Sequence, residues 1–193
     1  MDFLKSETFI NVSNAFAGEC QARMRYDYFA KVAGKEGYKF IEDIFKETAH
    51  NEKAHSKVFY NFLVKYIGHG NIKVQEEYPI SFSKTEDNLL YAAQGERKER
   101  GVLYPNGAEV AEREGFLVIA DAFIKIRDVE LLHEQRFLKL REMMLSDTLY
   151  KSDTKIKWKC RNCGHIHEGF EAPDTCPNCR HEIGYYSRYF EWF

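Results

Sequence analysis

Glutamate and histidine recur in this sequence at a spacing that suits metal binding. Glu-x-x-His motifs that fall within apolar helical stripes occur at Glu52–His55 and Glu130–His133. Residues three apart share a helical face, so each motif can direct a carboxylate and an imidazole to one point. Three further glutamates stand within apolar helical stripes, namely Glu19, Glu96 and Glu99. Because an unpaired buried charge is costly, five inward carboxylates predict bound cations.

The size of this ligand set favours two metal ions over one. Zinc uses about four ligands, whereas the seven groups present here suit two first-row ions that share bridging carboxylates. One glutamate from each of two helices, plus a Glu-x-x-His from each of two others, is the pattern of ferritin-like di-iron and di-manganese bundles. A solvated surface position is the ordinary alternative for any single helical glutamate. Here four predicted helices each place glutamate on their apolar face, and this agreement favours a metal site over separate surface positions.

The C-terminal segment carries a second candidate metal site. Two Cys-x-x-Cys pairs, Cys160–Cys163 and Cys176–Cys179, are separated by 12 residues, a spacing typical of tetrathiolate sites. Gly164 follows the first pair and can adopt the unusual backbone angles of such a turn. Arg180 holds the equivalent place in the second pair. Spacing alone does not separate iron from structural zinc.

Four long helices are predicted to position the glutamates. Apolar residues keep helical period over roughly 6–33, 38–66, 85–103 and 116–145, and Thr85 is the expected N-cap of the third helix. Gly34–Gly37 turns the first helix into an antiparallel hairpin with the second. Residues 71–84 lack helical period, and their length suits a crossover along a bundle. Tyr104–Gly107 predicts a kink or break, with roughly two more turns after it.

The sequence also contains a weak internal repeat. Gly18–Glu19 resembles Gly95–Glu96 at an offset of 77, and Glu52–His55 matches Glu130–His133 at an offset of 78. Both halves of the predicted bundle therefore offer the same kinds of ligand in the same order, which indicates a duplicated helical hairpin.

Composition limits the remaining possibilities. The chain has 193 residues, 44% of them hydrophobic, which suits one domain plus a small module. We expect a bundle over 1–146, a linker over 147–154 and a metal domain over 155–193. A net charge of -2 without long runs of like charge gives no reason to expect nucleic acid or membrane as a partner. The N-terminus lacks the apolar region of a signal peptide, so the cytoplasm is the expected compartment.

Several motifs together resemble the rubrerythrin family. They are Ala15–Glu19, the two Glu-x-x-His motifs, Gly95–Glu99 followed by Tyr104–Pro105, and Trp158–Gly164. The resemblance spans nearly the whole chain in the family's order. It implies an all-α ferritin-like four-helix bundle followed by a small rubredoxin-like domain, zinc-ribbon-like in build, with a β-hairpin and two cysteine knuckles.

The resemblance further implies a function and its cofactors. Rubrerythrins are non-haem di-iron peroxidases of anaerobes and microaerophiles that reduce hydrogen peroxide to water and protect against oxidative stress. Electrons reach the di-iron site through a tetrathiolate iron centre, which gives three iron ions per chain. An external donor, such as rubredoxin or an NAD(P)H-dependent reductase, and a homodimer or larger assembly are also implied.

Roles for individual residues follow from the same resemblance. Glu19, Glu52, Glu96 and Glu130 are implied to be permanent or bridging iron ligands, and His133 a fixed one. One iron is implied to exchange His55 for Glu99 between redox states. Tyr26 and Tyr104 match tyrosines that lie beside the ligands. Cys160, Cys163, Cys176 and Cys179 are implied to hold the third iron.

Two alternative functions remain. The bundle could serve a ferroxidase or iron-storage protein with a structural zinc knuckle, or the knuckles could be a zinc-binding interaction module.

The sequence departs from the family pattern at two places. Cys20 stands next to a candidate ligand, and we interpret it as a small buried residue without redox function. Arg180 and His181 are untypical after the last cysteine.

Overall fold

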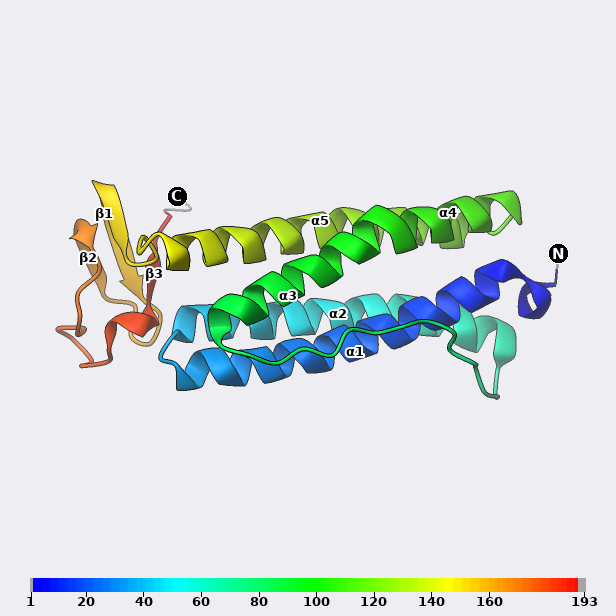
Figure 1. Ribbon diagram of the computed structural model, residues 1–193, viewed down its shortest axis with the longest axis horizontal. Coiled ribbons are helices and arrows are strands. Elements are labelled where there is room, and N and C mark those ends of the chain that lie inside the picture. Colours follow the sequence, from blue (N-terminus) through cyan, green and yellow to red (C-terminus); the bar gives the residue numbers. More distant parts are fainter. Residues whose placement is uncertain (1, 191–193) are drawn as a thin grey trace.

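The computed structural model describes residues 2–190 and contains a long helical bundle with a small sheet domain at one end (Figure 1). A 3-10 turn, η1 (Phe3–Lys5), precedes the bundle. Its long elements are α1 (Glu7–Lys35), α2 (Lys39–Ile67), α3 (Thr85–Lys98), the π-helix η2 (Glu99–Leu103), α4 (Tyr104–Arg113) and α5 (Leu117–Leu145). Because α3, η2 and α4 follow one another without a break, the bundle has four helical rods, which confirms the predicted fold class.

Local signals explain where the helices begin and turn. The Ser6 hydroxyl accepts a hydrogen bond from Phe9 N, 3.1 Å away, and so caps α1. The Glu114 carboxylate, at the end of α4, accepts from the backbone N–H groups of Glu7 and Thr8 at 3.0 and 2.8 Å. Gly37, with φ of 87°, makes the α1–α2 turn. Thr85 is the first residue of α3 rather than its N-cap, which is Lys84.

Of the kink or break predicted at Tyr104–Gly107, the break is wrong, because the helix continues through these residues. Instead, the helix widens into one π-helical stretch just before it, and Tyr104 N donates to Glu99 O. Pro105 is tolerated because it falls in the first turn of α4, where its missing N–H has little consequence. Gly107 serves packing: a Cβ there would lie 3.0 Å from the Phe123 ring of α5. Proline and glycine here mark a register change and a close helix contact.

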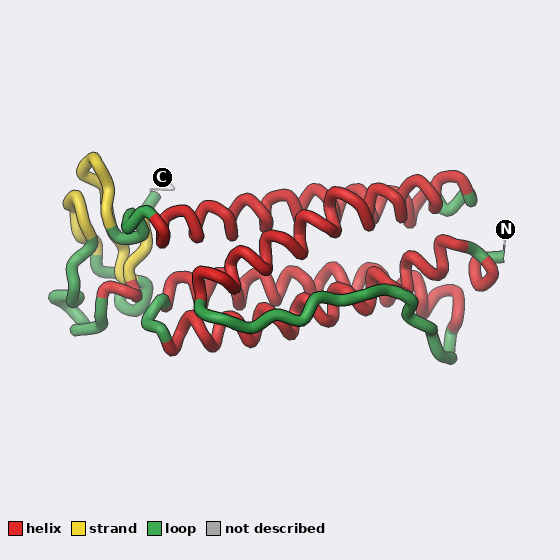
Figure 2. Tube along the Cα trace, in the orientation of Figure 1, coloured by secondary structure: helices red, strands yellow, loops and turns green. Residues whose placement is uncertain are grey.

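The crossover connection runs the length of the bundle as an extended segment (Figure 2). Its residues between α2 and α3 have no regular secondary structure, as the absence of helical period predicted. Side chains of α1 hold it: Asn14 Oδ1 accepts from Gln75 N at 2.8 Å, and Gln21 donates to Pro79 O at 2.9 Å. The segment therefore lies along α1.

Two apolar clusters fill the bundle on either side of a polar layer. One contains Phe29, Phe45 and Phe137, and the other contains Phe59 and Phe123. The candidate ligands lie between these clusters in each helix. No helix within residues 2–190 is long and apolar enough to cross a membrane.

The C-terminal domain is a three-stranded antiparallel sheet with the order β2-β1-β3. Its strands are β1 (Lys151–Cys160), β2 (Ile166–Glu171) and β3 (Tyr186–Arg188), with a 3-10 turn η3 (Ile183–Tyr185) before β3. Strand β1 begins inside the segment predicted as linker, and its first residue pairs with Glu171.

This domain docks on the α1–α2 end of the bundle (Figure 1). Arg161 Nε lies 2.9 Å from Asp43 Oδ2 of α2, and its guanidinium lies over the Phe40 ring. Gly184 approaches the α1–α2 turn so closely that a Cβ would lie 1.7 Å from Gly37 O. The domain therefore rests on the turn through a contact that only glycine permits.

Candidate metal centres

The structure gathers six of the seven predicted bundle ligands into one cluster. It forms two overlapping groups, whose ligand atoms lie within 4.8 Å of one another. The first group is Glu19, Glu52, His55 and Glu130; the second is Glu52, Glu96, Glu130 and His133. We call these six residues the Glu/His cluster. Glu52 and Glu130 belong to both groups, so they are placed to bridge two ions, each with its own glutamate and histidine.

Each imidazole presents its Nδ1 atom to several carboxylates. His55 Nδ1 lies 2.9 Å from Glu52 Oε2, 2.9 Å from Glu130 Oε1 and 3.7 Å from Glu19 Oε2. His133 Nδ1 lies 2.7 Å from Glu130 Oε2, 3.2 Å from Glu52 Oε1 and 3.8 Å from Glu96 Oε1. One nitrogen carries at most one proton, so it cannot satisfy three acceptors. Such convergence suits ligands around a cation.

Under-satisfied buried oxygens show that the cluster fits metal ions. Within the described part of the chain, one oxygen of each cluster glutamate has no hydrogen-bond donor of its own: Glu19 Oε2, Glu52 Oε1, Glu96 Oε2 and Glu130 Oε1. The imidazole nitrogens that lie near the Glu52 and Glu130 oxygens, at 3.2 and 2.9 Å, are shared with other carboxylates. All four residues are at most 1% exposed. A buried carboxylate oxygen left without a partner is destabilising. Metal ions would satisfy all four at once.

Two tyrosines orient the outer glutamates. Tyr26 of α1 donates a hydrogen bond to Glu96 Oε1 of α3 at 2.5 Å. Tyr104 of α4 donates in the same way to Glu19 Oε1 of α1. In Glu19 the phenol holds Oε1 while Oε2 faces His55, whereas in Glu96 the Oε1 atom held by Tyr26 is also the one that faces His133. Both hydroxyls therefore lie where the sequence comparison placed them, beside candidate ligands.

Ionisation in the cluster reflects the missing positive charge. Burial, reinforced by neighbouring carboxylates, raises the pKa values of Glu19 and Glu96 well above their usual range. Burial opposes ionisation of Glu130 too, but hydrogen bonds from both histidines lower its pKa to about 2. Carboxylate partners overcome burial and raise the pKa of His133 to about 12. Without metal, protons on the imidazoles supply the charge that the carboxylates require.

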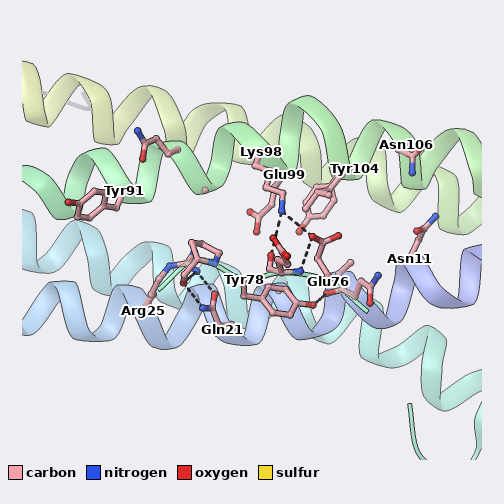
Figure 3. A pocket seen from close by; sticks show the side chains of 18 of the residues that line it. Asn11, Gln21, Arg25, Glu76, Tyr78, Tyr91, Lys98, Glu99, Tyr104 and Asn106 are labelled. Atoms are coloured by element: carbon pink, nitrogen blue, oxygen red, sulfur yellow. Dashed lines mark hydrogen bonds and ion pairs between the residues drawn. The ribbon is translucent and has the colours of Figure 1, made fainter. Parts of the chain in front are cut away.

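Glu99, the seventh predicted ligand, falls outside both groups. It opens the π-helix η2 and lines a cavity next to the cluster, together with Tyr104 and Tyr78 (Figure 3). Burial and the charges of Glu130 and Glu52 raise its pKa to about 8. The structure thus has His55 in the cluster and Glu99 outside it, which is one of the two arrangements in the predicted exchange.

One buried carboxylate, Glu134, was not singled out from the sequence. Glu134 of α5 is 2% exposed and accepts hydrogen bonds from Arg97 Nε at 2.6 Å and from Arg100 Nε. Arg100 follows Glu99 in the π-helix. Glu134 therefore ties the segment that carries Glu99 to the helix that carries His133. A glutamate directly after a candidate ligand, within an otherwise apolar stripe, was the available signal.

The four cysteines form the second candidate centre. Their sulfur atoms all lie within 4.8 Å of one another, and the Cys160–Cys179 and Cys163–Cys176 sulfur pairs are each 3.7 Å apart. Burial opposes ionisation of Cys176, but the neighbouring Tyr186 hydroxyl and backbone N–H groups lower its pKa to about 5. Low thiol pKa favours the thiolate, the form that binds metal.

Both cysteine knuckles have the same backbone turn. In the first, Cys160 N donates to His165 O and Gly164 N to Cys160 O; in the second, Cys176 N donates to His181 O and Arg180 N to Cys176 O. All four bonds measure 2.8–2.9 Å. Arg180 has φ of 64°, close to the 81° of Gly164. The second knuckle therefore adopts the expected turn despite its arginine.

Cys20 has a neighbourhood that keeps its thiol protonated. It is half-buried on α1, and burial raises its pKa. A protonated thiol is a poor nucleophile and metal ligand. This agrees with its interpretation as a space-filling residue, although it is less buried than we expected.

Comparison with known proteins decides the family. The family model described as rubrerythrin matches residues 11–141, and the model of the rubrerythrin rubredoxin-like domain matches residues 158–187. The chain belongs to the rubrerythrin family. It is 44% identical to a rubrerythrin of Clostridium perfringens over 97% of both chains. It is 42% identical to one of Porphyromonas gingivalis, covering 94% of this chain and 89% of that one.

Solved structures agree with this rubrerythrin assignment. A nigerythrin in a mixed-valence state aligns with a TM-score of 0.65 at 27% identity, over 98% of this chain and 94% of that one. A bacterioferritin of Desulfovibrio desulfuricans aligns with a TM-score of 0.66 at 18% identity, over 74% of this chain and 82% of that one. The second likeness shows only the shared bundle fold. The chain thus has a rubrerythrin-type di-metal carboxylate site and a rubredoxin-like four-cysteine site.

Proposed function

We propose that this chain is a peroxidase that reduces hydrogen peroxide to water at a pair of iron ions held by the Glu/His cluster. A third iron, bound by the four cysteines, relays electrons from an external donor. The observation that carries the proposal is the set of four buried glutamate oxygens that have no hydrogen-bond donor of their own and lie together with two imidazoles in one cluster. A tethered four-thiolate centre gives such a site a source of single electrons.

The chain's own residues prepare the site for this chemistry. A reduced iron pair supplies two electrons for cleavage of an O–O bond. Tyr26 and Tyr104 fix Glu96 and Glu19 by one oxygen each, which keeps the ligand geometry from relaxing. Glu99 lines the adjoining cavity. With metal ions held by the cluster, the Glu99 carboxylate would serve as a further anionic ligand for their oxidised state.

We infer that the electron relay involves a second chain. The four-cysteine site lies at the α1–α2 end of the bundle (Figure 1), while Glu19 stands 16 residues before the end of α1 at Lys35. At 1.5 Å per residue that is about 24 Å along the helix. We therefore propose a homodimer or larger assembly in which the cysteine centre of one chain lies near the Glu/His cluster of another.

Metal analysis coupled to a peroxidase assay tests the proposal. Purified protein should contain about three iron ions per chain and should show iron–thiolate colour. It should consume hydrogen peroxide when an NAD(P)H-dependent reductase supplies electrons. Colourless protein with zinc in the cysteine site, or ferrous oxidation without peroxide reduction, would instead favour the ferroxidase or iron-storage alternative.

A further inference from the structure

A cavity far larger than hydrogen peroxide adjoins the Glu/His cluster. Its volume is about 440 Å³, and it lies between α1 and the α3–η2–α4 rod, next to the crossover segment. It extends from Asn11 and Asn106 at one end to Arg25 and Tyr91 at the other, with Glu99 between them (Figure 3). Small-molecule sites measure roughly 300–1,000 Å³, whereas a water molecule occupies about 30 Å³ and hydrogen peroxide is not much larger.

Two glycines leave room for this cavity. Gly18 and Gly95 each stand directly before a cluster glutamate, and both line it. A Cβ at Gly18 would lie 3.4 Å from the Tyr78 ring and 4.0 Å from Glu99 Oε1. A Cβ at Gly95 would lie 3.4 Å from Arg25 Nη2. The repeated Gly-Glu pair thus leaves open space beside each glutamate, on both walls.

The crossover segment encloses the cavity on one side and is held in place there. Tyr78 donates a hydrogen bond from its hydroxyl to Asn14 O at 2.8 Å, and Pro79 O accepts one from Gln21 at 2.9 Å. Lys98 of α3 lies 3.1 Å from Glu76. Bonds to both walls fix this covering segment, so the cavity is preformed.

Its lining favours a neutral, partly apolar ligand. The two cations are already engaged: Lys98 pairs with Glu76, and Arg25 donates to Gln21 and to Pro79 O. The carboxylate of Glu77 further opposes an anion. Ala15, Leu103, Phe123 and the rings of Tyr78 and Tyr104 supply apolar contact.

We propose that this cavity binds neutral organic hydroperoxides, with the alkyl or aryl group in the cavity and the hydroperoxide group toward the Glu/His cluster. The proposal rests on the proposed peroxidase function. The substrate ROOH accepts two electrons from the reduced metal pair and two protons from water. Its O–O bond breaks, and it leaves as the alcohol ROH and water.

Filling the cavity should lower activity with an organic hydroperoxide much more than activity with hydrogen peroxide. The wild-type protein should reduce both hydrogen peroxide and cumene hydroperoxide. Ala15→Leu, which adds bulk to the cavity wall, should lower kcat/KM for cumene hydroperoxide at least about tenfold, which is about 1.4 kcal/mol, and change hydrogen peroxide turnover less than about twofold. Ala17→Leu is the control: it makes the same exchange at a half-buried position of α1 that does not line the cavity, and it should change neither activity. Gln94→Trp enters the cavity from an exposed position and repeats the test without altering the core.

A binding measurement tests whether the cavity takes such a ligand, independently of peroxidase turnover. Cumyl alcohol, the unreactive product, should bind the as-purified protein in a calorimetric titration. Ala15→Leu and Gln94→Trp should weaken it at least about tenfold, whereas Ala17→Leu should not. Absent binding to wild type, or equal loss of both peroxidase activities in the cavity variants, would overturn the proposal. If the wild-type protein binds cumyl alcohol but does not reduce hydrogen peroxide, the proposed peroxidase function is refuted instead.

Discussion

At the scale of single residues, the cluster is a set of carboxylates that need positive charge. Each cluster glutamate has one oxygen held by a tyrosine or histidine and another that, among the described residues, has no hydrogen-bond donor of its own. This division explains why the histidines hold protons tightly when metal is absent. It also makes the metal-free protein sensitive to pH.

Metal-free protein should become more stable as pH falls from about 9 to 6. Glu19, Glu96 and Glu99 have raised pKa values in the folded state, that of Glu99 about 8, so the folded chain binds protons that the unfolded chain does not. His55 and His133, whose pKa values are also raised, act in the same direction. The contributions are complete below the unfolded pKa values and vanish as pH rises through the folded ones.

Thermal melting of metal-free and iron-loaded protein checks this. The melting temperature of the metal-free form should rise by several degrees over that interval, and that of the loaded form should change little. The low pKa of Glu130 opposes the trend only below about pH 4.5, its unfolded value. Equal pH dependence in both forms would show that the carboxylates are not a metal cluster.

Glu96 and Glu99 should differ when mutated, although they share a helical face. Glu96→Ala removes a cluster member and should weaken ferrous binding at least about tenfold. Glu99→Ala should leave ferrous affinity almost unchanged but raise the reduction potential of the pair, because an anionic ligand favours the more positive oxidised state. Competition titration and redox titration of the two variants provide the comparison. The exchange model fails if both variants lose the same affinity and shift the potential equally.

At the scale of elements, the π-helix is the feature that places Glu99. It adds one residue to the turn at Glu99–Leu103, so the α3 ligands and Tyr104 of α4 keep separate registers. Glu134 holds this turn through Arg97 and Arg100. Side chains from α5 and η2 therefore fix the segment from which Glu99 would move.

Removing the two arginines should lower the melting temperature more than removing the glutamate that they bind. Glu134 is 3% exposed as a side chain, whereas Arg97 is 63% exposed. The double variant Arg97→Gln/Arg100→Gln strands a buried carboxylate and should lower the melting temperature by several degrees. Glu134→Gln leaves two arginines whose side chains are 63% and 32% exposed, so it should lower the melting temperature less. A larger loss in Glu134→Gln would mean that the ion pairs do not anchor the turn.

The sequence predicted the helices well because their apolar period is continuous, and their ends fall within about two residues of expectation. The ligand clusters were predictable because glutamate is rare in buried stripes. The π-helix was not, since Pro105 and Gly107 resemble a helix break and only tertiary contact with Phe123 shows otherwise. Nor was the cavity, because Tyr78 and Gln94 come together only when the crossover lies along α1 and α3.

At the scale of the molecule, the two metal centres are at different places along the bundle. The cysteine domain rests on the α1–α2 turn through Gly184 and the Arg161–Asp43 pair. Its position is therefore set by bundle residues far from the Glu/His cluster. Under the proposed electron relay, communication between the centres would depend on how chains assemble.

Gly184→Val should release the cysteine domain from the bundle. Any Cβ there would overlap Gly37 O, so the domain must shift while its own fold, centred on Trp158 and the cysteines, stays intact. Small-angle scattering should show a larger radius of gyration with unchanged iron–thiolate absorbance. Gly169→Ala, whose Cβ first meets the movable His167 ring, is the control. Unchanged scattering in Gly184→Val would contradict the docking contact.

Single-turnover oxidation of the Cys160→Ser variant tests the central claim most directly. The variant loses the four-thiolate site but keeps the Glu/His cluster. After anaerobic reduction, one equivalent of hydrogen peroxide per di-iron site should oxidise the iron pair completely, because peroxide accepts two electrons. Steady-state turnover with an external reductase should be abolished. No oxidation by that single equivalent would contradict the account, because the cluster would then depend on the cysteine centre for more than electrons.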